Sequence, residues 1–157
     1  MTYMHDPAIG TFNMARSYQV AALLIQNQSY PLPCYLEDSP TRVLLAFSLE
    51  LYLKAYLLQK DVPPNRVRKY GHKLAKIAKR CVQEGLDLPE GEAAEIRGIE
   101  NTNVVIDDRY FSSGMRKIPN DVRMQALADQ LCQTVGAELA RRDGLTLTEQ
   151  GISVAVR

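Results

Sequence analysis

Long apolar runs and a signal sequence are both missing from this chain of 157 residues. No stretch contains the roughly 18 consecutive apolar residues that a membrane-spanning helix needs. The first residues, MTYMHDPAIGTF, contain no basic segment followed by an apolar one, so we expect no secretory signal. With 46% apolar and 24% charged residues and a net charge of +1, the composition is typical of a soluble single-domain protein without membrane association.

Cysteine and histidine are scarce. The three cysteines, Cys34, Cys81 and Cys132, are widely spaced, and their odd number argues against a disulfide framework. We interpret them as small buried residues of a protein in the reducing cytoplasm. The only histidines are His5 and His72, and no Cys/His metal spacing, HExxH motif, EF-hand or glycine-rich phosphate loop occurs. The sequence therefore predicts no metal and no cofactor.

Five helical segments follow from the apolar spacing and from the positions of proline and glycine. They cover about residues 11–28, 39–60, 71–84, 89–101 and 120–144. We expect residues 1–144 to form an all-α bundle of four to five up-and-down helices. The tail, residues 145–157, alternates apolar and polar residues around Gly151, which indicates either a short β-hairpin or a frayed end.

Three of these segments carry apolar residues at helical spacing, which predicts the faces that they turn toward the core. The first stripe is Met14, Tyr18, Ala21 and Ile25. The second is Leu74, Ile77, Ala78 and Cys81, and the third is Met124, Leu127, Leu131, Val135 and Leu139.

Two opposite charges, Glu50 and Lys54, interrupt the apolar stretch SLELYLKAYLL. On a helix their face also carries Val43, Phe47 and Leu57, at the spacing of a buried seam. The opposite face carries the milder polar residues Ser48, Tyr52 and Gln59. An exposed pair contributes about 0.2–0.5 kcal/mol, whereas a desolvated pair costs several kcal/mol per ion before attraction offsets it. The pair is therefore either an edge pair whose lysine reaches solvent or a polar cluster in a groove.

Two short motifs follow one another in the second and third segments. LAFSLELYLKAYLLQK contains the pattern E-L-x-L-K at residues 50–54, and YGHKLAKIAKR contains G-H-x-L at residues 71–74. An Arg-Tyr pair, Arg109-Tyr110, stands after the fourth segment. Together these elements resemble the HEPN domain family over roughly residues 11–144.

The resemblance implies a helical bundle that is usually dimeric and binds nucleotides or RNA, with several members acting as ribonucleases of toxin–antitoxin or defence systems. It implies a homodimer, an RNA or nucleotide ligand, and a nucleotidyltransferase-type antitoxin partner. The nuclease members carry Arg, four to six residues and then His late in the bundle, and this sequence has no such late pair. Arg66 and His72 have five residues between them but stand before the third segment, so this spacing is either coincidental or catalytic.

A polar pocket is one interpretation of the remaining motif residues. His72 stands at a predicted helix start, where the helix dipole disfavours a charged imidazole, and it either packs locally or serves a site. Arg109 follows two aspartates and either pairs with them or joins the same site. The functional hypothesis is a pocket of Glu50, Lys54, His72, Arg109 and Tyr110.

Basic residues dominate residues 60–80, which contain eight Lys or Arg against one acidic residue. Four of them would share one face if the third helix extended one turn upstream, namely Lys69, Lys73, Lys76 and Arg80. Such a face suits the phosphates of nucleic acid. Alternatively the face is only solvated, or it complements the six acidic residues of 84–100.

Three functions stay open from the sequence alone. The first is a HEPN-like dimeric binding module for nucleic acid, a nucleotide or a toxin–antitoxin type partner. The second is a metal-independent ribonuclease whose catalytic candidates are His72, Arg66 and Arg109. The third is a purely structural dimerisation module.

Overall fold

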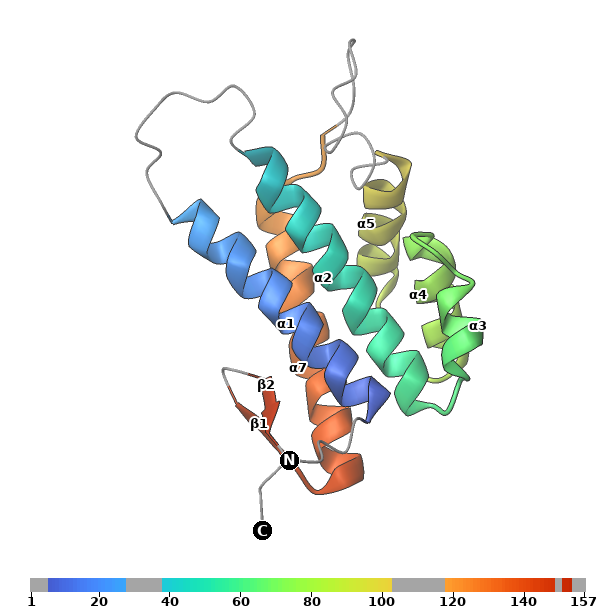
Figure 1. Cartoon of the computed structure of the whole chain (residues 1–157). Helices are drawn as coiled ribbons and strands as arrows, with labels where there is room; N and C mark the ends of the chain where they lie inside the picture. Colours follow the sequence, from blue (N-terminus) through green and yellow to red (C-terminus); the bar gives the residue numbers. More distant parts are fainter. Residues whose placement is uncertain (1–5, 28–37, 103–117, 149–150, 154–157) are drawn as a thin grey trace.

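The computed structural model describes residues 6–27, 38–102, 118–148 and 151–153 and has six helices and one small hairpin in these ranges (Figure 1). The helices are α1 (Pro7–Gln26), α2 (Asp38–Gln59), α3 (Pro64–Arg68), α4 (Leu74–Gln83), α5 (Glu90–Asn101) and α7 (Asp121–Asp143). The strands are β1 (Thr146–Thr148) and β2 (Gly151–Ser153). The predicted all-α bundle with a short terminal hairpin is thereby confirmed.

Helix α2 is the central element of the bundle. It packs against α1 and α7 on one side and against α3 and α4 on the other, and α5 covers α4. In Figure 1, α1, α2 and α7 form one group, and the shorter helices α3, α4 and α5 lie beside it. Because neighbours surround α2, it is buried nearly all round, and this burial determines what its two charged residues contact.

The helix boundaries follow from capping residues that the sequence displays. Asp6 caps α1, since its carboxylate accepts hydrogen bonds from the backbone N–H groups of Ala8 (2.7 Å) and Ile9 (3.3 Å). Proline occupies the first position of α1, so the helix begins four residues before the predicted start at 11. Asn120 caps α7 in the same way, and Gly144 ends that helix in the left-handed conformation with φ 63°.

The segment between α2 and α4 differs from the prediction. Residues 61–70 lie between the predicted helices, yet Pro64 is the first residue of the short helix α3, a position that proline favours. The third predicted helix begins at Leu74 and not at Gly71, because Gly71 adopts φ 57° and belongs to the turn between α3 and α4. His72 and Lys73 therefore lie in this turn.

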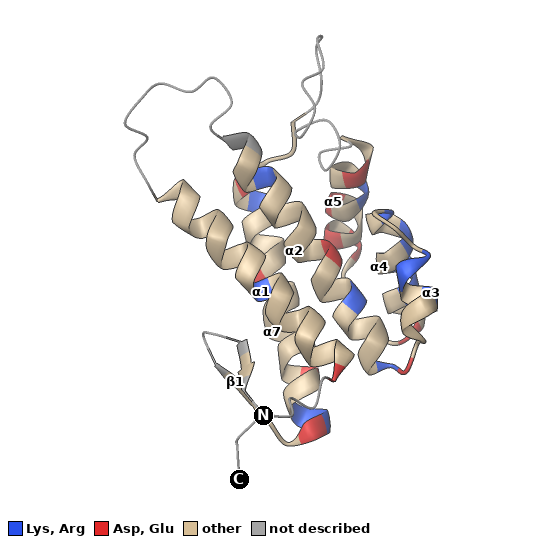
Figure 2. Cartoon of the chain, viewed as in Figure 1, with Lys and Arg blue, Asp and Glu red and all other residues tan. Residues whose placement is uncertain are grey.

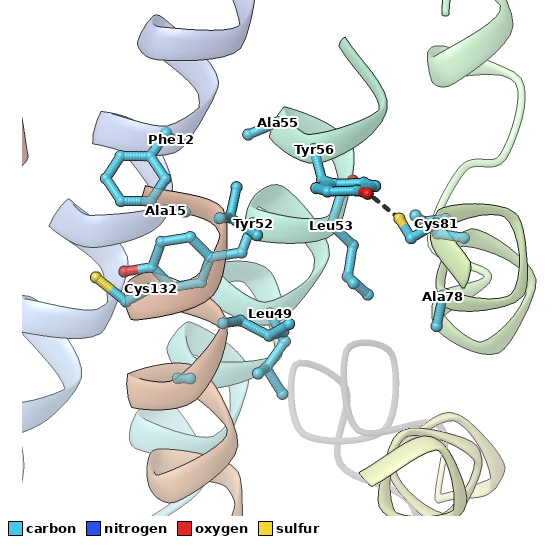
Figure 3. Packing of buried hydrophobic residues seen from close by; sticks show 14 of the residues in the cluster. Phe12, Ala15, Leu49, Tyr52, Leu53, Ala55, Tyr56, Ala78, Cys81 and Cys132 are labelled. Carbon is cyan, nitrogen blue, oxygen red and sulfur yellow. Dashed lines mark hydrogen bonds between the residues drawn. The ribbon is translucent and has the colours of Figure 1, made fainter. Parts of the chain in front are cut away.

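The core centres on large side chains of α2. Tyr52 packs against Phe12 of α1 with ring centroids 5.2 Å apart, and Cys81 of α4 donates its thiol hydrogen to the carbonyl oxygen of Leu53 at 3.3 Å (Figure 3). The predicted core stripes of α4 and α7 are buried as expected. These contacts join the α1–α2–α7 group to α4.

The predicted core face of α1 is wrong. Met14 is 53% exposed, and Tyr18, Ala21 and Ile25 are only half-buried. The buried stripe is Ala8, Phe12, Ala15, Gln19 and Ala22. Its alanines let α1 approach α2 closely, and the buried Gln19 accepts a hydrogen bond from the Tyr52 hydroxyl at 2.6 Å. The buried face of α1 therefore contains a hydrogen-bonded glutamine. Because apolar spacing alone selects a face without polar residues, it predicted the wrong face.

The terminal hairpin is docked onto the bundle. Its strands are antiparallel, with Leu147 opposite Ile152. The side-chain amide of Asn13 donates to the Ile152 carbonyl oxygen (3.1 Å) and accepts from its N–H (2.9 Å). Leu147 lies against Gly136 of α7, where an added Cβ would come within 2.9 Å of the Leu147 side chain. The absence of a side chain at 136 is therefore what lets the hairpin approach α7.

Candidate functional site

A buried carboxylate joins α2 to the turn between α3 and α4. The Glu50 Oε1 atom lies 2.5 Å from Lys54 Nζ, one turn along α2, and its Oε2 atom lies 2.8 Å from His72 Nδ1. Glu50 is 4% exposed, whereas the side chain of Lys54 is 15% and that of His72 is 54% exposed. The group therefore runs from the interior to the surface, and we call Glu50, Lys54 and His72 the polar cluster.

The geometry of the polar cluster assigns a role to each atom. An ionised Glu50 only accepts hydrogen bonds, so Nδ1 of His72 carries the hydrogen of the Glu50–His72 contact. In the neutral imidazole, Nε2 then keeps its lone pair, and the side chain that carries it is more than half exposed. Glu50 can thus orient His72 while Lys54 neutralises the buried charge.

The imidazole of His72 also contacts an aromatic ring. The ring of Phe47 meets that of His72 edge-on, with centroids 5.9 Å apart and planes at 73°. Tyr18 of α1 in turn packs on Phe47 at 5.6 Å. The sequence pattern predicted that Phe47 shares a helix face with Glu50, but it predicted no contact of either aromatic residue with His72. The three-residue spacing of Phe47 and Glu50 was the available signal.

The expectation that the milder polar residues of α2 lie on its solvent-exposed side is wrong. Ser48 and Tyr52 are fully buried and Gln59 is 7% exposed, although the sequence analysis assigned them to the side opposite the charges. Neighbouring helices enclose α2 on both sides, so the side that carries Ser48, Tyr52 and Gln59 is not exposed to solvent. Its least buried positions include Val43, Phe47 and Lys54, and the Glu50 side chain lies beside this edge.

The predicted basic stripe also differs from the structure. Lys69 is the C-cap of α3 and Lys73 the N-cap of α4, so the four predicted residues do not lie on one continuous helix. Arg80 forms an ion pair with Glu84 one turn later, and Lys76 Nζ lies 5.7 Å from the centroid of the Tyr70 ring. The left-handed turn at 71 is the reason that the stripe is interrupted.

A broader group of cations surrounds this turn. Six exposed side chains come from α3, α4 and the turn between them, namely Arg66, Arg68, Lys69, Lys73, Lys76 and Lys79. We call this group the basic surface, and Figure 2 shows basic residues gathered on α3 and α4. Within the part of the chain that the structure describes, none of the six forms an ion pair. Arg68 and Lys79 were not among the predicted binding residues, although both stand in the basic segment 60–80.

The acidic helix α5 does not neutralise the basic surface within the described ranges. Glu90 pairs with Arg97 of its own helix at 2.5 Å, and Glu95 pairs with Arg123 of α7 at 3.6 Å. Glu100 accepts a hydrogen bond from the backbone N–H of Ala75 and thereby caps the start of α4. Among the described residues, the alternative that the basic segment complements the acidic residues of 84–100 is therefore limited to this backbone contact and to the Arg80–Glu84 ion pair.

Three of the five residues of the hypothetical pocket come together in the polar cluster. Arg109 and Tyr110, the other two, lie in 103–117, outside the described residues. Arg66, the further catalytic candidate, is an exposed residue of α3 and makes no hydrogen bond or ion pair with His72 among the described contacts. Among the described residues, His72 thus pairs with the carboxylate of Glu50 and not with Arg66.

Comparisons with protein-family models, curated proteins and solved structures found no match for this chain. The resemblance to the HEPN family therefore depends on the motifs quoted above. Across the described ranges, no helix is long and apolar enough to span a membrane, and no three His, Cys, Asp or Glu side chains are grouped to hold a metal ion.

Proposed function

We propose that this protein is a HEPN-like binding module for RNA or another polyphosphate chain. The observation that carries the proposal is the basic surface, six exposed cations without an ion-pair partner among the described residues. Keeping so many like charges together destabilises a fold unless a ligand of opposite charge offsets the repulsion. Lysine and arginine contacts to phosphates would supply affinity and position without reading sequence.

The polar cluster adjoins this surface. His72 stands between Lys69 and Lys73 in the turn, with its side chain 54% exposed. A strand bound along the turn would therefore pass the imidazole. Glu50 and Phe47 fix the orientation of His72, which supports a defined path for the ligand and not a diffuse electrostatic contact.

Salt dependence of RNA affinity tests the proposal. If four to six of the cations contact phosphates of a single strand, the slope of log K against log salt should be about −3 to −4. Replacing Lys69, Lys73 and Lys76 with Gln should reduce the slope by about 2 units. The control changes three exposed arginines of α7, Arg123, Arg141 and Arg142, to Gln and should preserve the slope. Equal effects of the two triple variants, or absence of binding, would contradict the proposal.

A metal-independent ribonuclease is the second candidate, and the Glu50–His72 hydrogen bond favours it. A carboxylate that holds Nδ1–H leaves Nε2 to take a proton from a ribose 2′-hydroxyl, the arrangement of a general base. Arg66 or Arg109 would then stabilise the charge on the phosphate. The test is RNA cleavage in the presence of EDTA by the wild type and by His72→Ala. An undiminished rate in the variant would eliminate this candidate.

A further inference from the structure

A polar hollow of about 260 Å³ lies where the end of α2 meets α3 and α4. It is lined by Lys60, Asp61, Val62, Pro63, Arg66, Tyr70, Arg80 and Glu84. The polar cluster contributes no residue to it. The volume is slightly below that of pockets for drug-sized ligands, which indicates a small ligand or one end of a larger one.

Three cations line the hollow, one just after α2, one in α3 and one in α4. Lys60 follows α2, and its Nζ lies 3.1 Å from a Glu138 carboxylate oxygen and 5.0 Å from the centroid of the Tyr56 ring. Arg66 of α3 is exposed and has no ion pair among the residues described. Arg80 of α4 gives one guanidinium nitrogen to Glu84, while its Nε is buried and lacks a hydrogen-bond partner in the described structure. Arg66 and the guanidinium of Arg80, whose side chain is 41% exposed, therefore retain donors for a ligand.

The lining also contains two carboxylates, and they limit what the ligand can be. Glu84 is already engaged by Arg80. Asp61, at φ 59°, is exposed and has no ion pair within the described part of the chain. Glu138 neutralises Lys60 just as Glu84 neutralises Arg80, so within the described part of the chain Arg66 and Asp61 are the two charged lining residues without an ion pair. The guanidinium donors of the lining suit an acceptor-rich anion.

We propose that this hollow binds a phosphomonoester, supplied either by the terminal phosphate of a bound RNA or by a free mononucleotide. The inference rests on the proposed function, because Arg66 belongs both to the hollow and to the basic surface. A strand lying on the basic surface could thus place its end in the hollow. A phosphomonoester carries about −1.5 to −2 charges near neutral pH, against −1 for an internal phosphodiester, so the hollow favours an end over the middle of a strand.

The test compares one oligoribonucleotide with a 5′-phosphate, a 3′-phosphate or hydroxyl ends by fluorescence anisotropy, with AMP and inorganic phosphate as competitors. One charge-assisted hydrogen bond contributes enough for roughly a tenfold or greater gain in affinity for one phosphorylated end. Arg66→Gln should remove this gain. Arg68→Gln is the matched control, since it is an exposed arginine two residues away on α3 that does not line the hollow, and it should preserve the gain.

A charge change of opposite sign gives an independent check. Asp61→Asn removes a negative charge from the lining, and asparagine accepts the left-handed backbone at this position. This variant should bind the phosphorylated end several-fold more tightly. Arg80→Gln should lose the gain as Arg66→Gln does, with circular dichroism as a check of its fold.

The outcomes separate this inference from the proposed function. RNA binding that ignores end phosphates and resists AMP and phosphate would overturn the hollow as a phosphomonoester site and leave the RNA proposal standing. Direct binding of AMP, measured by calorimetry and abolished by Arg66→Gln, without RNA binding, would support the hollow with the free nucleotide as its source and overturn the RNA proposal. An equal gain in Arg66→Gln and wild type would also overturn the inference.

Discussion

Replacing Glu50 is the most direct test of the polar cluster. Both carboxylate oxygens are engaged and the residue is 4% exposed, so Glu50→Leu leaves the Lys54 ammonium without its partner at 2.5 Å. Removing one member of a buried ion pair costs about 3–5 kcal/mol. Because the Lys54 side chain is 15% exposed and can extend toward water, we expect about 2–3 kcal/mol here.

A double-mutant cycle isolates the pair from the change in shape. Lys54→Met alone leaves a buried carboxylate with only His72, and we expect it to cost about 2–3 kcal/mol as well. The double variant, Glu50→Leu with Lys54→Met, replaces the pair by apolar groups of similar length and should stay within about 1 kcal/mol of the wild type. The expected coupling free energy is thus roughly 3 kcal/mol or more.

Urea unfolding followed by far-ultraviolet circular dichroism provides the free energies, provided that all four proteins share one m-value. A loss below about 0.5 kcal/mol for Glu50→Leu would match an exposed helical pair. Single effects that simply add in the double variant would mean that the two charges do not interact. Either result would refute the view that Glu50 and Lys54 form a desolvated pair.

Two further predictions concern the core. Gly136→Ala should lower the free energy of unfolding by about 1–3 kcal/mol, since its Cβ would lie 2.8 Å from Phe12 and 2.9 Å from Leu147; an unchanged urea midpoint would contradict this packing. Burial raises the pKa of the Cys81 thiol and of the Tyr52 phenol, so the folded protein keeps protons that the unfolded chain releases. Stability should therefore fall as pH rises above the ordinary pKa values of 9.0 and 10.0, and a flat profile from pH 8 to about 11 would contradict it.

Local signals in the sequence predicted much of the fold. Asn120 and Gly144 mark the ends of α7, because capping depends on neighbouring residues, and the alternating tail included the hairpin as one of two alternatives. The face of α1 was not predictable from spacing, since both of its sides are apolar and the buried one contains Gln19. Helix α3 was not predicted because two consecutive prolines usually end a helix. Here the second proline is instead the first residue of a helix, where proline is favourable.

The candidate site was only partly predictable for a similar reason. The four-residue spacing of Glu50 and Lys54 is a local property, and it correctly indicated that the two side chains meet. The contact with His72 requires the chain to leave α2, form α3 and return, which no spacing encodes. The bend at Gly71 likewise moved Lys69 and Lys73 off the expected helix. Tertiary packing decided the contact between Glu50 and His72, and the left-handed backbone at Gly71 decided where the lysines lie.

The two hydrogen bonds between Asn13 and Ile152 have a consequence for folding during synthesis. The two residues are 139 positions apart, so during synthesis α1 emerges long before the backbone group that completes its contacts. The first half of α1 can reach its final environment only once β2 has left the ribosome, and closing so long a loop is a late and slow event. A fusion partner attached directly after this strand would therefore disturb the contacts of α1, at the opposite end of the polypeptide.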